Sequence, residues 1–443
     1  MRITFIQPAI GHRPGKRYLR SWQMEPLPVA TLSGLTPAGI EQHFHDDRME
    51  IIPYDRPTDL AVIPVETYTA RRAYQIAAQY RRRGVKVIMG GFHATLVPDE
   101  AQEHADAVVT GEAEGIWEEV LDDAQHNTLQ ARYLGERGDL SKIRVNRSIF
   151  RDKRYLPVGL IETGRGCPFP CEFCAVQTFF ERSYRARPVD DVIAELRGLR
   201  HEKKVFFFVD DNFAGDLKRG REILTALEPL KLRWLTQMSI NAAHDETFVA
   251  QLAKSGCRGV LIGFESLDEG NLRMMNKGFN TMKSGFTGAL DNLRRHGILV
   301  YGTFVFGYDH DTASSFDEAV DFALDQKMYL AAFAHLTPFP GTPLYKRLQQ
   351  EGRLRFNAWW LEQGFMYNEL PFTPHGLTPE AVTNGCVAAR RRFYAWPNIL
   401  RRSIGNYSDF FMFRNFFPIN AMHRNEISQR HGHPLGEPVP AQE

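Results

Sequence analysis

The chain has 443 residues and a mass of 50.7 kDa, which suggests two or three domains. Hydrophobic residues make up 43 % and charged residues 24 %, so packed cores are expected and the disordered and fibrous classes are excluded. With 54 Lys and Arg against 53 Asp and Glu, the net charge of +1 gives no general attraction to nucleic acid or to an anionic membrane.

Apolar runs in the chain are short, 205–209 being typical, and none approaches the ~18 residues that a membrane-spanning helix requires. The first ten residues, MRITFIQPAI, lack the long apolar stretch and the small-residue cleavage site of a signal peptide. We therefore expect a cytoplasmic protein without a transmembrane segment.

Residues 1–135 alternate short apolar runs with amphipathic stretches. In residues 71–83, apolar side chains recur every three to four positions on one face and polar ones, mostly arginines, lie largely on the other. This spacing predicts a helix that ends at Gly84. The order of strand, helix and strand predicts an open parallel sheet in this region. The predicted strands are 3–6, 60–65, 85–89 and 107–109.

Six β/α repeats follow a charged stretch that we interpret as a linker at 136–156. They predict a partial (β/α)6 barrel of the TIM type over 157–372, with its chemistry at the carboxyl ends of the strands. Residues 373–443 are predicted to form a helical C-terminal element. The predicted strands are 158–162, 205–209, 232–238, 259–263, 299–306 and 331–336, and the helices are 189–199, 219–227, 245–255, 281–296 and 313–324.

Three of the five cysteines, Cys167, Cys171 and Cys174, form the sequence CPFPCEFC directly after the first barrel strand. Three thiolates on one loop can hold three irons of a 4Fe-4S cluster and leave the fourth iron without a protein ligand. A structural zinc site is disfavoured because it needs four ligands, usually in two pairs, and Cys257 and Cys386 lie far along the chain. A group of three core thiols without a metal is also disfavoured, because a glycine- and proline-rich loop gives no reason to pack three thiols together.

The spacing CxxxCxΦC, with Phe173 as the aromatic residue before the third cysteine, resembles the radical S-adenosylmethionine (SAM) family over about residues 157–345. The resemblance implies that the open iron chelates SAM and that one electron cleaves it to methionine and a 5'-deoxyadenosyl radical. It also implies that Phe173 lies against the adenine. A reducing protein such as flavodoxin or ferredoxin is expected as a partner.

Further segments of this family's pattern follow in order. Asp210 and Asp211 end the second barrel strand, where the family places polar groups against the methionine moiety, although a helix cap and a surface charge are alternatives. Glu265 ends the fourth strand, where a carboxylate typically meets the ribose or the amino group. Lys277 and Arg273 are expected to be surface residues rather than ligands.

Two glycine loops follow strands of the N-terminal sheet: Gly90-Gly91-Phe92-His93 and the segment that begins at Gly111. Ligands of open parallel sheets bind at this edge, and glycine allows close approach to the backbone. This order, upstream of a radical SAM core, resembles the Rossmann-like cobalamin-binding domain of cobalamin-dependent radical SAM enzymes. It implies that Gly90, Gly91, Gly111 and His93 lie at the cobalamin, although His93 has capping of the turn as an equal alternative.

One position departs from that resemblance. Cobalamin domains that donate an axial histidine carry DxHxxG, and here Ile10 stands where the aspartate would orient His12. We therefore predict that His12 is not a cobalt ligand and that cobalamin, if present, is bound with its own base displaced.

Residues 390–424 contain seven arginines, nine aromatic residues and one acidic residue, Asp409. This composition would suit a membrane surface, a lipid-like or anionic aromatic substrate, or nucleic acid. We favour a helical cap on the barrel, with arginine stems covering apolar surface, and expect no nucleic-acid partner. The aromatic residues are Phe393, Tyr394, Trp396, Tyr407, Phe410, Phe411, Phe413, Phe416 and Phe417.

Taken together, these features predict a cobalamin-dependent radical SAM enzyme that methylates an unactivated carbon of a small or lipid-like molecule. A radical SAM oxidoreductase or cyclase, similar to the anaerobic ring-forming enzymes of tetrapyrrole synthesis, has the same domain order. A sensor of corrinoid or redox state that does not cleave SAM is an alternative from another class.

Overall fold

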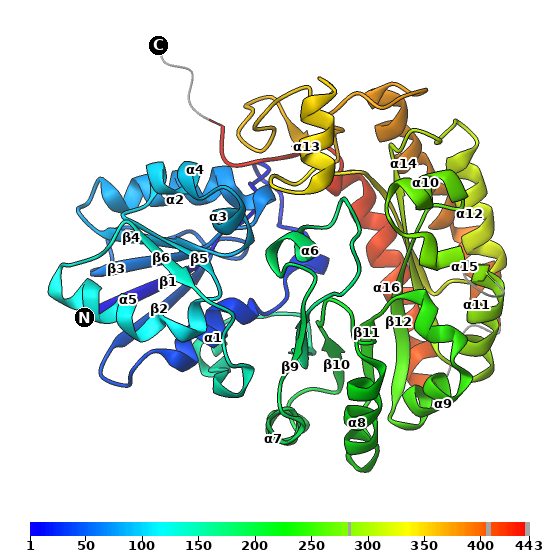
Figure 1. Ribbon diagram of the computed structural model, residues 1–443, viewed down its shortest axis with the longest axis horizontal. Helices are drawn as coiled ribbons and strands as arrows, with labels where there is room; N and C mark the ends of the chain where they lie inside the picture. The colour runs from blue at the N-terminus through cyan, green and yellow to red at the C-terminus, as the bar shows by residue number, and fades with distance from the viewer. Residues whose placement is uncertain (282–284, 405–408, 439–443) are drawn as a thin grey trace.

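The computed structural model describes residues 1–281, 285–404 and 409–438. Two six-stranded parallel sheets, each covered by helices, stand side by side in the molecule (Figure 1). The α/β class, the open N-terminal sheet, the partial barrel and the C-terminal helices are as predicted from the sequence.

The first sheet has the strand order β2-β1-β3-β4-β5-β6. All four predicted strands are present, and two further strands lie at the edges of the sheet. β2 has the polar sequence EQHFHD, and β6 has only four residues with alternating burial, so neither produces the apolar run that reveals a central strand. The strands are Arg2–Gln7 (β1), Glu41–Asp46 (β2), Leu60–Pro64 (β3), Lys86–Gly90 (β4), Ala107–Gly111 (β5) and Arg132–Gly135 (β6).

Five helices accompany this sheet: Leu27–Leu35 (α1), Ala70–Arg81 (α2), Phe92–Leu96 (α3), Pro98–His104 (α4) and Trp117–His126 (α5). The helix predicted at 71–83 is α2, and its apolar face packs into the core through residues such as Ile76, Ala77 and Tyr80. Helix α3 begins directly after the Gly90-Gly91 turn. Because β3, β4 and β5 are parallel neighbours in the sheet, their carboxyl ends form one edge, and this edge faces the second sheet (Figure 1).

The second sheet has the order β14-β13-β12-β11-β10-β7, with every neighbouring pair parallel. Its first and last strands do not pair with each other, so the barrel is open, as predicted. The strands are Val158–Ile161 (β7), Val205–Phe208 (β10), Trp234–Gln237 (β11), Cys257–Glu265 (β12), Leu299–Phe306 (β13) and Leu330–His335 (β14). A small antiparallel ribbon, Gly164–Gly166 (β8) and Tyr184–Ala186 (β9), follows β7.

The helices predicted between these strands are Val189–Leu199 (α7), Leu217–Leu227 (α8), Glu246–Lys254 (α9), Gly285–Arg295 (α11) and Ser315–Asp325 (α12). The start of the helix predicted at 281–296 includes 282–284, which lie outside the described residues. Three shorter helices are Ala175–Phe179 (α6), Glu269–Met274 (α10) and Pro343–Gln350 (α13).

The two faces of β13 differ in burial. Phe304 stacks on Phe264 of β12 and on Phe333 of β14, with ring centroids 5.5 and 5.4 Å apart, and this side packs under the covering helices. Side chains on the opposite side, Tyr301 and Thr303 among them, are only half-buried. The alternation shows that the second face of the sheet lines the incompletely filled inside of the barrel.

Helices Pro379–Phe393 (α14), Trp396–Ser403 (α15) and Phe410–Arg430 (α16) form the C-terminal element. Arg402 is fully buried there, donates to the carbonyls of Met328 and Tyr329, and lies 3.8 Å from the Phe393 ring centroid. This packing supports the helical-cap interpretation. Tyr407 lies outside the described residues. No helix in the described ranges is long and apolar enough to cross a membrane.

The end of the chain returns to the first domain. His433–Pro434 (β16) pairs with Met366–Tyr367 (β15), and the backbone N–H of Gly436 donates to the carbonyl of Ile10 at 2.6 Å. The last described residues thus tie the C-terminal element to the segment after β1.

Candidate functional site

The cysteine loop begins where β8 ends and lies between the two strands of the β8–β9 ribbon. Gly166, immediately before Cys167, has φ +85°, and a side chain there would overlap the carbonyl of Ser183. Only glycine therefore fits this position of the ribbon. Cys171 is buried, Cys167 and Cys174 are half-buried, and all three thiols are free.

Burial raises the pKa of all three thiols, that of Cys171 to about 12, because a thiolate is poorly solvated in this loop. The charge of Lys277 opposes the shift at Cys171, while the charges of Cys167 and Cys174 add to it. The thiols therefore remain protonated until a metal displaces the protons. Three mutually interacting thiols on one loop fit three corners of a 4Fe-4S cluster. No set of three His, Cys, Asp or Glu side chains in the described ranges is arranged to hold a single metal ion.

The end of β10 lies against this loop. Asp211 accepts a hydrogen bond from the N–H of Gly166 at 2.7 Å, and burial raises its pKa to about 6. Asn212 Nδ2 lies 3.6 Å from Cys167 Sγ and 2.7 Å from Ser239 Oγ. Asn212 was not predicted as a site residue, although its position directly after the Asp pair could have indicated it.

Asp210 has a different environment. It is 1 % exposed, and its carboxylate accepts hydrogen bonds from the backbone N–H, at 2.7 Å, and the hydroxyl of Thr163. Burial raises its pKa to about 7. Because Thr163 precedes the β8 ribbon, Asp210 fastens the end of β10 to the start of the cysteine loop. Neither the helix cap nor the surface charge considered for Asp210 is observed.

Glu265 ends β12 in the left-handed region, with φ +64°, at an irregularity in its pairing with β13. Its carboxylate lies 2.6 Å from Nζ of Lys277, which also donates to the carbonyl of Gly263 at 3.0 Å. The expectation that Lys277 is a surface residue is wrong, because Lys277 is 8 % exposed and its charge acts on Cys171 and Cys174. Arg273 is exposed beside Glu269, as expected.

Phe173 is half-buried and packs against the barrel core. Its neighbour in the loop, Phe169, stacks on Phe279 with ring centroids 4.1 Å apart. This contact joins the cysteine loop to the segment that carries Lys277. The loop is thus held by the residues after β10 and by residues 275–279, whose Lys277 in turn contacts Glu265 at the end of β12.

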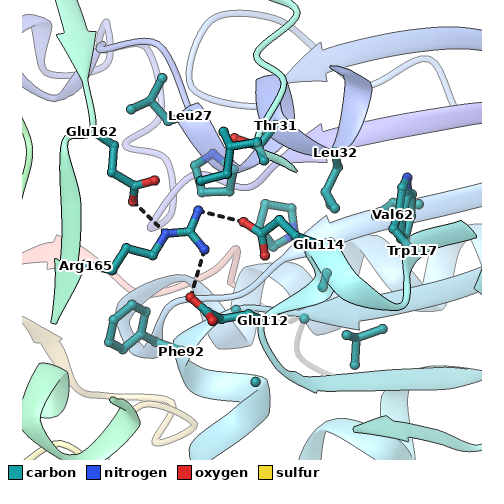
Figure 2. A pocket seen from close by; sticks show the side chains of 18 of the residues that line it. Leu27, Thr31, Leu32, Val62, Phe92, Glu112, Glu114, Trp117, Glu162 and Arg165 are labelled. Atoms are coloured by element: carbon teal, nitrogen blue, oxygen red, sulfur yellow. Dashed lines mark hydrogen bonds and ion pairs between the residues drawn. The ribbon is translucent and has the colours of Figure 1, made fainter. Parts of the chain in front are cut away.

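A cavity lies between the carboxyl edge of the first sheet and the start of the second. It contains about 1200 Å³ of space, part of it open to solvent, and Figure 2 shows the side chains around it. Gly90, Gly91 and Gly111 line one side, and Arg165, two residues before Cys167, lines the other. The cavity therefore lies between the glycine loops and the ribbon that leads into the cysteine loop, and none of the three cysteines lines it.

The comparisons with known proteins agree with this arrangement. Residues 161–323 match the family model described as "Radical SAM superfamily". The chain is 31 % identical over 406 residues to bacteriochlorophyllide d C-12(1)-methyltransferase of Chlorobaculum tepidum, covering 88 % of this chain and 87 % of that protein. The chain belongs to the radical SAM superfamily. Its function as a radical SAM enzyme, with a 4Fe-4S cluster and SAM, is thereby confirmed.

Two further similarities extend over most of the molecule. Bacteriochlorophyllide d C-8(2)-methyltransferase of the same organism is 29 % identical, over 86 % of this chain and 88 % of its own length. The solved structure of the radical SAM methyltransferase TsrM from Kitasatospora setae, which contains cobalamin and a 4Fe-4S cluster, superposes with a TM-score of 0.67 at 17 % identity. It covers 97 % of this chain and 100 % of that one, so the two-domain fold is shared.

The glycines of this radical SAM enzyme have reasons of their own to be glycine. Gly91 has φ +96°, and an added Cβ would lie 3.0 Å from the carbonyl oxygen of Val65. Gly111 has φ +75°, and a Cβ there would overlap the carbonyl of Gly135 on β6. Gly90 has ordinary room for a Cβ. The backbone itself therefore requires glycine at 91 and 111, whatever ligand the cavity holds.

An ion-pair network that the sequence did not reveal crosses the cavity. Arg165 contacts Glu112 at 2.9 Å, Glu114 at 2.6 Å and Glu162 at 2.9 Å (Figure 2). Arg185 donates to both oxygens of Glu112 at 2.7 Å. Although burial alone would raise it, the pKa of Glu112 is lowered, because the two arginines stabilise the carboxylate. This network joins the loop after β5 to the ribbon before the cysteines.

The two candidate histidines lie away from the cavity lining. His93, a residue of α3, is fully buried, with Nδ1 3.2 Å from Thr67 Oγ1 and Nε2 3.0 Å from Glu100 Oε1. The predicted contact of His93 with a cofactor is therefore not supported. His12 has Nδ1 2.6 Å from Glu437 Oε1 and Nε2 2.7 Å from the carbonyl of Asp47. Both of its ring nitrogens are engaged, which agrees with the prediction that His12 is not a cobalt ligand.

Proposed function

We propose that this radical SAM enzyme is a cobalamin-dependent C-methyltransferase that acts on a bacteriochlorophyllide-type tetrapyrrole. The observation that carries the proposal is the cavity between the two sheets, because glycine loops line one side of it and the ribbon leading to the cysteines lines the other. Two reactive cofactors can face each other across such a space, with the substrate between them. The similarity to two bacteriochlorophyllide methyltransferases over most of the chain supports the substrate class.

The chain supplies the following groups. Cys167, Cys171 and Cys174 would hold three irons, leaving one iron for SAM. When bound, the cluster supplies the electron that converts SAM to methionine and a 5'-deoxyadenosyl radical, which removes a hydrogen atom from the substrate carbon. Glu265, which Lys277 contacts at 2.6 Å, would accept hydrogen bonds from SAM. Phe173 would pack against the adenine.

The first sheet would carry the second cofactor. When bound, cobalamin would supply the methyl group for the substrate carbon, with a second SAM as the source of its replacement. Each turnover then consumes two electrons, which an external reductant such as flavodoxin or ferredoxin provides. Gly90, Gly91 and Gly111 would bring the backbone close to the corrin ring, and Arg165 with Glu112 would keep the two loops in register.

Methyl transfer is tested with the anaerobically reconstituted enzyme, reductant, SAM labelled with CD3 and a bacteriochlorophyllide. We expect 5'-deoxyadenosine, S-adenosylhomocysteine and a product heavier by one CD3 group that replaces hydrogen. A product that has lost hydrogen or gained oxygen would instead indicate an oxidoreductase or cyclase. Absence of SAM cleavage under reduction would indicate a sensor. Full cluster formation without any cobalamin uptake would also contradict the proposal.

A further inference from the structure

The side chain of Arg390 has a terminal nitrogen without a hydrogen-bond partner among the described residues. Arg390 lies near the C-terminal end of α14, and its Nη1 atom is buried without an acceptor. Within the described parts of the chain, no carboxylate forms an ion pair with it. Its neighbour Arg392, by contrast, pairs with Asp317 at 3.0 Å and with Asp321 on the surface. A shielded cation that the protein leaves without an acceptor is a candidate binding group for an external anion.

Other interior arginines of this protein have an acceptor for at least one terminal nitrogen, although the Nε atoms of Arg187 and Arg402 are also buried without a partner. Arg353 pairs with Asp309 at 2.7 Å, and Arg187 pairs with Glu195 at 2.8 Å. Arg402 has no acid but donates to several carbonyls and to Asn420. Arg390 therefore departs from the pattern that the fold uses elsewhere for arginine.

The charge of Arg390 acts on groups from three parts of the molecule. Burial has the larger effect on the pKa of the Tyr68 and Tyr301 hydroxyls and of the His335 ring, and it favours the neutral form of all three groups. The positive charge of Arg390 lowers each of these pKa values. Tyr68 follows β3 of the first sheet and lies 3.0 Å from the Thr337 hydroxyl, just beyond β14. Tyr301 belongs to β13. Helix α14, which carries Arg390, packs against β14, and the contact of Tyr68 with Thr337 brings the first domain to the end of that strand.

Two of these neighbours also have unused hydrogen-bonding capacity. His335 Nδ1 is buried without a partner, and the Tyr301 hydroxyl makes no hydrogen bond with the described residues. Tyr301 is half-buried on the incompletely filled inner side of the barrel. Tyr68 adds an aromatic face, packed on Tyr367 with ring centroids 5.0 Å apart. The surroundings thus combine one cation, free polar groups and aromatic rings.

We propose that Arg390 binds the carboxylate of the tetrapyrrole substrate, with Tyr68 and Tyr301 beside it. This inference rests on the proposed function and extends it, because it requires the free acid of the pigment rather than its ester. A guanidinium presents two parallel N–H groups that match a carboxylate, and chlorophyllide-type pigments carry a propionic acid. Aromatic side chains around the cation suit the adjoining apolar macrocycle.

The test uses pheophorbide a and its methyl ester as probes, which differ in the free carboxylate. Binding to the cluster- and cobalamin-loaded protein is measured by fluorescence titration for the wild type and for Arg390→Gln, Arg390→Lys and Arg392→Gln. We expect the wild type and Arg392→Gln to prefer the acid. In Arg390→Gln, affinity for the acid should fall about tenfold or more and affinity for the ester should not change. Arg390→Lys should retain part of the preference.

Affinities for SAM and cobalamin are measured in the same variants and should be unchanged, with thermal unfolding as the folding check. Equal binding of acid and ester by the wild type would overturn the role of Arg390 and leave the proposed methyl transfer intact. A weakened SAM or cobalamin affinity in Arg390→Gln would assign the guanidinium to a cofactor instead. Failure of the wild type to bind either probe would refute the tetrapyrrole class and this inference with it, whereas cleavage of SAM would still distinguish the enzyme from a sensor.

Discussion

The carboxylate of Glu112 lies 2.9 Å from the guanidinium of Arg165, and both side chains are largely buried. Glu112 directly follows the glycine that ends β5, whereas Arg165 belongs to the ribbon that leads into the cysteine loop. The pair therefore joins the loops of the two domains across the cavity. The proposed chemistry requires such a connection, because two cofactors carried by separate domains react only at a fixed separation.

Glu112→Gln should impair coupling between the domains more than SAM cleavage. Removing the charge leaves the guanidinium of Arg185 without its carboxylate partner, and breaking such a buried pair typically costs about 3 to 5 kcal/mol of stability, whereas Arg165 keeps Glu114 and Glu162. We expect a lower melting temperature and a larger loss of methyl transfer than of 5'-deoxyadenosine formation. Glu181→Gln is the control, because Glu181 pairs with Arg137 on the surface. Equal losses of both activities in Glu112→Gln would contradict the coupling role.

Cys171→Ala should abolish the cluster without unfolding the protein, because Cys171 lies in a loop after the first barrel strand. Iron and sulfide analysis of the reconstituted variant, with circular dichroism, measures both effects. Cys386→Ala, a buried cysteine in α14, is the matched control and should keep the full cluster. A wild-type iron content in Cys171→Ala would refute the assignment of the loop.

Glu265→Gln should weaken SAM binding by about tenfold or more, because a charge-assisted hydrogen bond contributes roughly 1.5 to 3 kcal/mol. Lys277 would keep its hydrogen bond to the Gly263 carbonyl in this variant. Isothermal titration with SAM, on protein of matched cluster content, provides the measurement. Glu269→Gln on exposed α10 is the control. An unchanged dissociation constant would place Glu265 outside the SAM site.

Gly111→Ala should destabilise the protein even in the absence of cobalamin. Its φ of +75° is unfavourable for alanine, and the added methyl group would overlap the Gly135 carbonyl. We expect a loss of about 1 to 3 kcal/mol in denaturant unfolding. Gly115→Ala is the control, since a Cβ there meets nothing within 4 Å and its φ is not in the left-handed region. An Ala variant of normal stability that loses only cobalamin would show that the ligand, not the fold, requires this glycine.

The stability of the C-terminal segment should depend on pH through His12. The hydrogen bond to Glu437 raises the pKa of His12 above its ordinary value of 6.5. Because the folded-state pKa is raised, the contact stabilises the fold fully below about pH 6.5 and is lost as the pH rises through the folded-state pKa. The protection factors of residues 433–437, which are corrected for the intrinsic rise of hydrogen exchange with pH, should therefore fall as the pH rises through the folded-state pKa of His12, and His12→Ala should remove this fall. The visible spectrum of bound cobalamin should be the same in His12→Ala as in the wild type, and a changed axial-ligand spectrum would contradict the displaced-base prediction.

Most of the features that could be predicted from the sequence depend on residues that lie close together along the chain. The spacing of Cys167, Cys171 and Cys174 identifies the radical SAM loop because all three ligands lie within one turn region. The central strands β4 and β13 are evident from their apolar sequences. In β4 the middle residues are buried on both faces, whereas in β13 buried and half-buried residues alternate. The edge strands β2 and β6 escaped prediction because one side of each faces solvent or another chain segment, which permits polar residues.

Tertiary structure alone decided the partners of charged residues that lie far apart in the chain. Lys277 is charged and close to glycine, so its sequence context suggests a surface position, yet the return of the chain after β12 buries it against Glu265. His93 follows a glycine loop in the pattern of a ligand, but α3 turns its ring into the core toward Glu100. The unpartnered state of Arg390 is likewise invisible among its arginine neighbours. The sequence determines which side chains are available and how regularly the apolar ones recur along each helix or strand. The pairing of buried charges depends instead on how whole helices and strands pack. Only this packing determines which charged groups lose contact with water.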